Sequence, residues 1–256
     1  MNIIAKLFSL LFVLLYLSGC AGNSENSSFA KSVFQTNGAS GVREDTDMLM
    51  KLLLEYSVKL NKRNPNNYSK EYSKYIIGSI KNHSLSMRLP LLKSNPNATY
   101  KEYLNIAFDK KYVQNRSDYL IVGIYKLLYW AYEMDRSYTV TAMQYDLPKV
   151  QKANEVMQIV QYRIKTAKDV DGNYLFLTWQ RQWQVDLLKK MNKKTLLAQD
   201  MSLACYDEKL LLSSSNMSFE VITSNMIFVI QKTLKSLGAE PNNLSASAIK
   251  GIFFFL

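Results

Sequence analysis

Side chains that could carry out catalysis or bind a metal are scarce in this 256-residue chain. His83 is the single histidine, and it lies in a polar stretch far along the sequence from Cys205. One histidine excludes a multi-histidine metal site and disfavours a Ser-His-Asp or Cys-His arrangement. The run Gly38-Ala39-Ser40-Gly41 lacks the spacing of a nucleophile elbow, and the sequence has no phosphate-binding loop or dinucleotide-binding fingerprint. The sequence therefore predicts a protein that is not an enzyme and binds no cofactor or metal.

Two acidic side chains are the best remaining candidates for acid–base chemistry. Glu133 and Asp135 close the most apolar stretch of the chain, where a carboxyl group is most readily desolvated. A glycosidase-like reaction needs only two carboxyl groups at a fixed separation, which sequence spacing does not test. Ion pairing with Arg136 or Lys126 is the simpler role, and we expect it.

The segment Asp169-Val170-Asp171-Gly172-Asn173 resembles part of a calcium-binding loop. With Gly172 at the sixth loop position, the first and twelfth positions fall on Ala167 and Thr178. Both lack the carboxylate that calcium coordination requires there. We therefore predict a tight turn between two helices, made of residues that favour turns.

Aromatic side chains at helical spacing are the main candidates for binding. Tyr125, Tyr129 and Tyr132 share one face of a predicted helix, and Trp179 and Trp183 share one face of another. Aromatics at this spacing usually form core. The alternative is a groove for a partner helix, a lipid or a glycan strand, because tyrosine and tryptophan combine apolar area with a hydrogen-bonding group.

The N-terminus carries a targeting signal. Lys6 and the apolar run Leu7–Tyr16 precede Leu17-Ser18-Gly19-Cys20, and this arrangement resembles the lipobox of bacterial lipoproteins. The resemblance implies a signal peptide over residues 1–19, cleavage before Cys20, lipid acylation of Cys20, and attachment to a membrane through that lipid. Ala21 follows in place of the aspartate that favours inner-membrane retention, which implies the periplasmic face of the outer membrane.

Composition supports one soluble domain behind this anchor. Residues 20–44 are rich in serine, asparagine and glycine and predict a flexible tether, while residues 45–256 predict a single domain. Cys205 is then the only remaining cysteine, so no intramolecular disulfide forms, and we expect a buried thiol. The 32 basic and 21 acidic residues give a net charge of +11. Outside the cytoplasm, that charge suits anionic lipid or acidic proteins, and we expect no nucleic-acid partner.

The sequence of this domain predicts an all-α fold, because apolar residues recur every three or four positions and glycine and proline are scarce. It predicts an antiparallel helical bundle or helical-hairpin array of about seven or eight helices. Asp146 is expected to cap a helix with Pro148 in its first turn, and Gly238 to end another. We expect helices from residue 45 to the break at 64–67, over about 68–82, 99–110, 117–132 (the central core helix), 146–167, 174–191, 195–212 and 218–237, and from about 243.

These features favour a non-enzymatic lipoprotein that serves as a scaffold or accessory subunit of an envelope machine, such as a secretion, pilus or outer-membrane assembly system. Two alternatives stay open: a helical binding protein for an amphiphilic ligand, and an immunity-type inhibitor. A large apolar cavity would favour the first alternative. The C-terminal run Phe253–Leu256 must dock either in the domain itself or on a partner, since four consecutive large apolar residues are costly in water.

Overall fold

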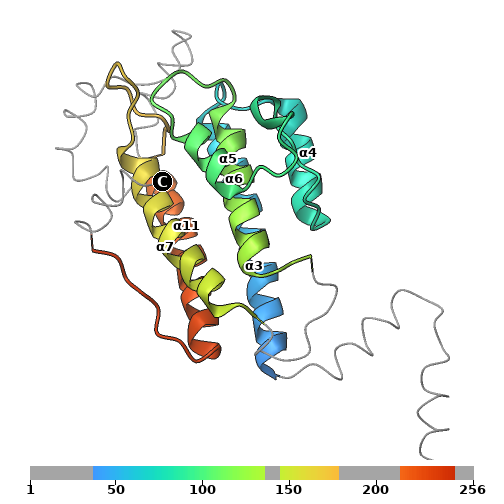
Figure 1. The fold of residues 1–256 in the computed structure, drawn as a ribbon. Helices are drawn as coiled ribbons and strands as arrows, with labels where there is room; N and C mark the ends of the chain where they lie inside the picture. The colour runs from blue at the N-terminus through green and yellow to red at the C-terminus, as the bar shows by residue number, and fades with distance from the viewer. Residues whose placement is uncertain (1–36, 136–144, 179–213, 246–256) are drawn as a thin grey trace, which may run out of the picture.

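The computed structural model of the protein describes residues 37–135, 145–178 and 214–245 (Figure 1). Within these ranges the fold is all-α, with six α-helices, a short 3-10 turn and no strand, so the predicted class is confirmed. The number of helices expected for the whole chain depends partly on residues outside the described ranges. The elements are α3 (Asn37–Arg63), α4 (Lys70–Lys81), η1 (Pro90–Leu92), α5 (Tyr100–Ala107), α6 (Arg116–Ala131), α7 (Leu147–Thr166) and α11 (Ser214–Ser236).

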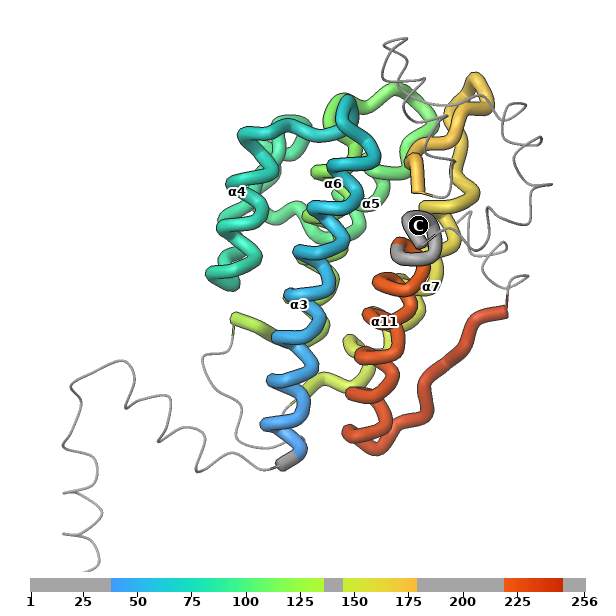
Figure 2. The backbone as a smooth tube through the Cα atoms, turned by 180° about the vertical axis from the view of Figure 1, so that it is seen from behind, coloured from blue at the N-terminus to red at the C-terminus, as the bar shows by residue number. Residues whose placement is uncertain are grey.

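The four long helices form an antiparallel bundle. Each of α3, α6, α7 and α11 packs against two of the others, so that they close a ring in the order α3–α6–α7–α11. Figures 1 and 2 show the direction alternating around this ring: α3 and α7 run upward, and α6 and α11 run downward. Helix α4 packs on α3 and α6 at one edge, and α5 packs on α6. None of the helices in the described ranges is long and apolar enough to cross a membrane.

Helix α6 lies at the centre of the fold, as the sequence predicted. It contacts α3, α4, α5 and α7, and nearly all of its side chains are buried. A helix that is apolar on almost every side must be covered on almost every side. The ring partners α3 and α7 cover part of α6, and the short helices α4 and α5 pack against it from outside the ring. The core around it includes the fully buried rings of Tyr56, Tyr103, Tyr125 and Phe176.

The predicted helix ends of α7 and α11 are confirmed. The Asp146 carboxylate caps α7 by accepting the Lys149 N–H at 3.3 Å, and proline follows in the first turn. Beyond α11, Gly238 has a φ of 84°, and the Ala239 N–H reaches the Leu234 carbonyl at 2.9 Å. This is a Schellman ending, which places a glycine in the left-handed region.

The first helix begins earlier than predicted. Helix α3 starts at Asn37, so residues 37–44 are helical, although their serine and glycine content suggested part of the tether. Ala39 and Val42 are completely buried, because this first part of α3 takes part in the packing of the bundle. Tertiary burial thus overrides a weak local propensity. Helix α6 also begins slightly early, at Arg116, with Asn115 as its N-cap.

The turn after α7 is confirmed, but the helix expected from Tyr174 is wrong at its start. The Asp169 carboxylate accepts the N–H groups of Asp171 and Asn173 at 3.0 and 2.8 Å, and Gly172 has a φ of 81°. Lys168 and Tyr174 then form an isolated antiparallel bridge, and residues 174–178 are not helical. The buried seam of α7 packs against α6 and α11 instead. The remainder of the expected 174–191 helix lies outside the described residues.

Residues 239–245 run back along α7 without forming a helix. Asn154, which is fully buried, donates to the Asn242 carbonyl at 2.7 Å, and Gln158 donates to the same oxygen at 2.8 Å. Gln158 also accepts the Leu244 N–H at 2.9 Å. The helix expected from about residue 243 has therefore not begun by Ser245, and the Phe253–Leu256 run lies outside the described residues.

Candidate functional site

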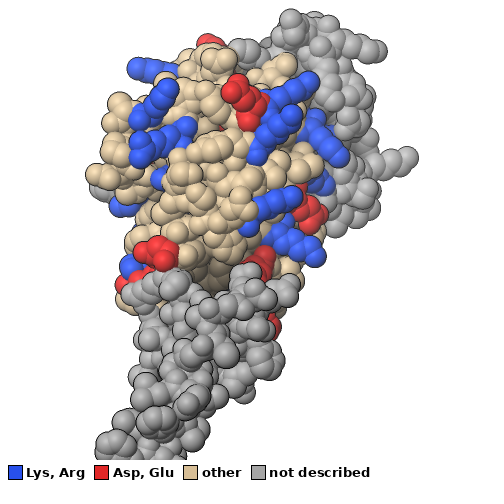
Figure 3. Space-filling view, turned by 90° about the vertical axis from the view of Figure 1, so that its right-hand side faces the viewer, with Lys and Arg blue, Asp and Glu red and all other residues tan. Residues whose placement is uncertain are grey.

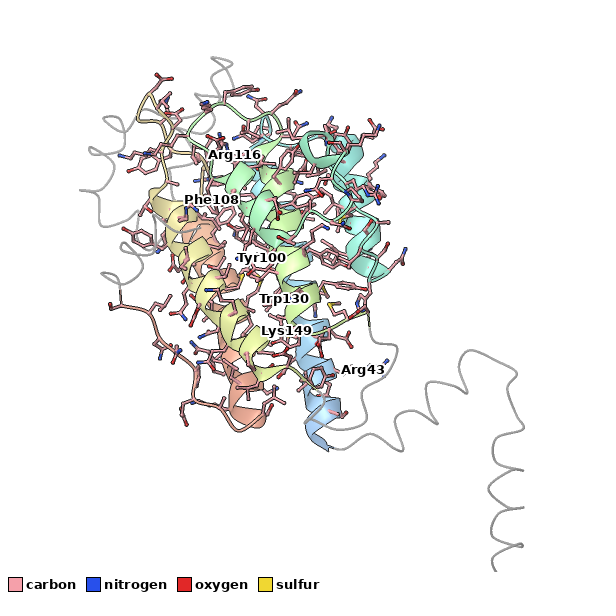
Figure 4. All side chains as sticks on the ribbon, viewed as in Figure 1. Arg43, Tyr100, Phe108, Arg116, Trp130 and Lys149 are labelled. Atoms are coloured by element: carbon pink, nitrogen blue, oxygen red, sulfur yellow. The ribbon has the colours of Figure 1, made fainter. Side chains whose placement is uncertain are left out.

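An open groove of about 730 Å³ lies between α5, α6 and α7. The N-terminal turn of α5, the C-terminal half of α6 and the N-terminal half of α7 form its walls, and the loop after α4 adds one edge. In Figure 4, Tyr100, Trp130 and Lys149 follow one another down the same side of the molecule, from these three helices in turn. The lining comprises Leu85, Ala98, Thr99, Tyr100, Lys101, Lys126, Tyr129, Trp130, Glu133, Asp135, Lys149 and Lys152.

Three aromatic rings form the apolar wall of this groove. The rings of Tyr100 and Trp130 lie 5.5 Å apart at an interplanar angle of 40°, and Trp130 is 38 % exposed. Tyr129 is nearly buried and packs edge-on against Tyr125 at 5.8 Å. Tyr100 is 6 % exposed, so Trp130 supplies most of the exposed aromatic surface, and the two tyrosines hold the wall behind it. A large ring held in one orientation presents apolar area at low entropic cost to a ligand.

The start of α5 is fixed by a capping box, which places Tyr100 at the first helical position. The Thr99 side chain accepts the Lys101 N–H at 3.3 Å, and Glu102 accepts the Thr99 N–H at 2.9 Å. Both bonds satisfy N–H groups that helix geometry leaves without partners. The Tyr100 ring is therefore positioned by backbone geometry as well as by its contact with Trp130.

Four lysines and two acids line the groove, so the charge of its lining is positive. Lys126 donates to the Ala98 carbonyl at 2.9 Å and lies 5.2 Å from the centre of the Tyr103 ring. Its pKa is lowered, first by desolvation and then by the nearby charge of Arg88. Lys152 is half-exposed and lies 3.3 Å from Glu155 on the same helix. Lys101 is exposed at the mouth.

Lys149 is held at the lower end of the groove. Its ammonium group lies 2.6 Å from Glu133, 3.4 Å from Asp146 and 6.0 Å from the Trp130 ring centre. The hydrogen bond to Glu133 is the main reason that the Lys149 pKa is raised. Glu133 is buried and has a φ of 48°, so the ion pair stabilises the left-handed backbone that ends α6.

The sequence predicts Arg136 or Lys126 as the ion-pair partner of Glu133 and Asp135. Glu133 pairs with Lys149, which lies sixteen residues away, and Lys126 instead binds a backbone carbonyl. Arg136 lies outside the described residues. The Glu133 carboxylate forms an ion pair at 2.6 Å, which gives it a structural role. Asp135, two residues further on, is exposed. In the described ranges, no group of three or more His, Cys, Asp or Glu side chains could hold a metal ion.

The residues singled out from the sequence fall in different places. Tyr125 and Tyr132 are buried in the core, whereas Tyr129 lines the groove. Cys20, Trp179 and Trp183 lie outside the described residues, as does Cys205.

Sequence reasoning did not find Trp130, Tyr100 or Lys149. One signal was available for α6: Lys126 and Trp130 lie four residues apart and are the side chains of the C-terminal half of this otherwise apolar helix that stay partly exposed, and Glu133 follows just after its end. Lys126 and Trp130 mark the part of α6 that its neighbours leave uncovered. The contributions of α5 and α7 depend on tertiary packing and carry no comparable local signal.

On the face of the molecule that carries α4, basic and acidic side chains are mixed and do not form separate patches (Figure 3). Figure 3 shows lysine and arginine side chains distributed over this face, with acidic side chains between them. The basic side chains on this face are therefore spread over it and are not concentrated in one patch there (Figure 3). Local concentration of charge matters more than the total for recognising an anionic ligand.

Comparison with known proteins gives no relative for this chain. No protein-family model, no curated protein and no solved structure matches it.

Proposed function

We propose that the helical domain binds an amphiphilic ligand with an anionic group in the groove between α5, α6 and α7. The observation that carries this proposal is the combination of an open, aromatic-walled groove of about 730 Å³ with a rim of lysines. Small-molecule sites are typically concave, mostly apolar and of this size, with a few polar groups that fix the orientation.

The two parts of such a ligand would meet different parts of the groove. Its apolar part would cover the exposed face of Trp130 and the small exposed edges of Tyr100 and Tyr129, and each Å² removed from water contributes about 25 cal/mol. Its anionic group would lie near Lys126, which donates to a backbone carbonyl, or near the half-exposed Lys152, which faces one carboxylate, because Lys149 already faces two. Desolvation lowers the pKa of Lys126, so an anion placed beside it would gain from stabilising the charged form.

The cellular setting is part of the proposal. The lipobox-like run ending at Cys20 supports a protein anchored by lipid to the periplasmic face of the outer membrane, where lipids and other amphiphiles are at hand. Replacing Cys20 with alanine should move the chain from the membrane fraction to the soluble fraction. Retention of the Cys20→Ala variant in membranes, unaffected by salt, would show that the anchor is not a lipid on this residue.

Binding can be tested with 1-anilinonaphthalene-8-sulfonate, an anionic aromatic amphiphile whose fluorescence rises in apolar sites. We expect saturable binding to the full chain, weakened about tenfold by Trp130→Ala and by Lys152→Ala. The matched controls are Phe228→Ala and Lys235→Ala, which remove an exposed aromatic ring and an exposed lysine from α11. Equal affinity in all four variants, with unchanged melting temperatures, would contradict the proposal.

A second candidate function is the accessory role in an envelope machine that the sequence favoured. The supporting observation is an apolar stripe on α11, where Val221 and Phe228 lie two helical turns apart and are 48 % and 65 % exposed. Crosslinking in intact envelopes, followed by affinity purification, tests this role. Recovery of the same envelope subunits with the wild type and with Phe228→Ser would exclude this stripe as their docking surface.

A further inference from the structure

A second pocket, of about 280 Å³, lies at the other end of α6 from the groove. Its walls come from α4, the loop containing η1, the loop before α6 and the first turns of α6. The lining comprises Tyr72, Leu89, Pro90, Leu91, Tyr112, Val113, Gln114, Asn115, Asp118 and Tyr119. Asp118 and Trp130 are twelve residues apart on one helix, so the pocket and the groove are about 18 Å apart and act as separate sites.

Asp118 is the only charged residue in this lining. It is 2 % exposed, and one of its carboxylate oxygens accepts the Ser69 N–H at 2.9 Å. Among the described residues, no lysine or arginine lies within ion-pair distance of it. A buried carboxylate with one backbone hydrogen bond and no cationic partner leaves most of its negative charge uncompensated.

Three tyrosines line the same pocket as this carboxylate. Tyr119 is fixed, because its hydroxyl accepts the Leu91 N–H at 3.0 Å and its ring lies 6.2 Å from Tyr103. Tyr72 is half-buried on α4, and Tyr112 is 65 % exposed at the mouth. Aromatic faces attract cations within about 6 Å of the ring centre, and more strongly when the site excludes water.

We infer that this pocket binds a small organic ammonium ion. The carboxylate supplies a counter-charge, and the tyrosine rings supply both apolar contact and cation–π attraction. A calcium ion takes six to eight oxygen ligands and magnesium takes an octahedral set, which a lining with one carboxylate fits poorly. The inference stands independently of the proposed amphiphile site, since it uses none of the residues that line the groove.

Tetramethylammonium is a suitable probe, because it cannot donate a hydrogen bond and reports the charge and ring contacts alone. Saturation-transfer NMR on the full chain, at about pH 8 where Asp118 is ionised, should detect binding at millimolar concentration, with sodium chloride of equal strength as the reference. We expect Asp118→Asn to weaken binding at least about tenfold, because the amide keeps an acceptor for Ser69 but loses the charge.

Two further variants complete the test. Tyr112→Leu removes an exposed ring at the mouth without disturbing the core and should weaken binding severalfold, whereas Asp47→Asn neutralises an exposed acid on α3 and should change nothing. No binding to the wild type, or equal binding to the wild type and both pocket variants, would overturn the inference. If the wild type binds tetramethylammonium but shows no saturable binding of anilinonaphthalene sulfonate, that result would contradict the proposed groove and leave the inference about the pocket standing.

Discussion

Asn64 and Leu177, 113 residues apart in sequence, are joined by two hydrogen bonds. The Leu177 N–H donates to the Asn64 side-chain oxygen at 2.8 Å, and the Asn64 amide donates to the Leu177 carbonyl at 3.1 Å. The same amide donates to the Leu60 carbonyl at 3.0 Å, at the end of α3. One side chain thus ends a helix and satisfies both backbone groups of Leu177, a buried residue that belongs to no helix or strand.

Replacing Asn64 should therefore destabilise the fold. Asn64→Ala leaves the buried N–H and carbonyl of Leu177 without these partners, and each unsatisfied group costs about 1–3 kcal/mol. We expect a loss of about 2–4 kcal/mol in the free energy of unfolding, measured by urea denaturation. Asn66→Ala, at an exposed position in the same turn, is the control and should change stability by less than about 0.5 kcal/mol. Equal effects of the two substitutions would contradict this account.

A buried polar network joins three helices of the bundle. Tyr132 at the end of α6 donates to the Thr233 hydroxyl of α11 at 3.1 Å, and that hydroxyl lies 2.9 Å from the Asp45 carboxylate of α3. Lys232 pairs with the other oxygen of Asp45 at 2.6 Å. The Tyr132 hydroxyl, considered from sequence as a candidate binding group, is thus engaged in structure.

Thr233→Val tests this network with almost no change of shape. It removes the acceptor of the Tyr132 hydroxyl and a donor to Asp45, and both groups are buried. We expect a loss of about 1–3 kcal/mol in the free energy of unfolding. In the control, Thr166→Val, the exposed hydroxyl bonds only to a carbonyl of its own helix, so a change below about 0.5 kcal/mol is expected. A neutral result at Thr233 would show that the network adds nothing to stability.

Local signals predicted the helix ends well. Asp146 with Pro148 and Gly238 each act on backbone groups within a few residues, so the sequence alone contains the information. The apolar seam of α7 was likewise predicted, although its partner was not.

Long-range contacts account for what the sequence could not predict. Residues 37–44 are helical because the bundle buries Ala39 and Val42. Residues 174–178 are not helical, and Asn64 hydrogen-bonds both backbone groups of Leu177 within this segment. The groove has the same origin, since Tyr100, Trp130 and Lys149 belong to three helices and meet only when α5 and α7 pack against α6. The spacing of apolar residues identifies the apolar face of each helix, but it does not show which helix faces are left uncovered when the helices pack together.

The pH dependence of stability should report the burial of Asp118. Desolvation is the main cause that raises the pKa of this carboxyl from 3.8 to about 7, opposed by the Ser69 hydrogen bond. Between these values the folded chain keeps a proton that the unfolded chain releases, so stability falls as pH rises from about 4 to 7 and then levels off. Asp118→Asn should flatten this dependence and exceed the wild type at pH 8 by about 2–4 kcal/mol.

Urea denaturation at pH 4 to 8 measures this effect, and Asp47→Asn serves as the exposed control. Near pH 4 the carboxyl is protonated in the folded chain and roughly half protonated in the unfolded chain, so the difference in stability between the wild type and Asp118→Asn should narrow to about 0.5 kcal/mol there. Parallel curves for these two proteins over the whole range would show that Asp118 is ionised at low pH in the folded chain.

Two helical glycines should respond oppositely to the same substitution. A methyl group at Gly123, in the middle of α6, would lie 2.7 Å from Cδ2 and 2.9 Å from Cγ of Leu104 on α5, and 3.2 Å from its backbone nitrogen. At Gly78 on α4, a methyl group would meet no atom within 4 Å. Alanine at an open helical site stabilises by up to about 1 kcal/mol, because it reduces the backbone entropy of the unfolded chain.

We therefore expect Gly78→Ala to raise the melting temperature and Gly123→Ala to lower it. At Gly123 the close approach to Leu104 must be relieved by moving α5, and overpacking of this kind costs about 1–3 kcal/mol, more than alanine gains. Because α5 positions Tyr100, Gly123→Ala should also weaken binding of the anionic probe in the groove, while Gly78→Ala leaves it unchanged. A stabilised Gly123→Ala variant would show that α5 can move away from α6 at no cost, and that Tyr100 is not held by this contact.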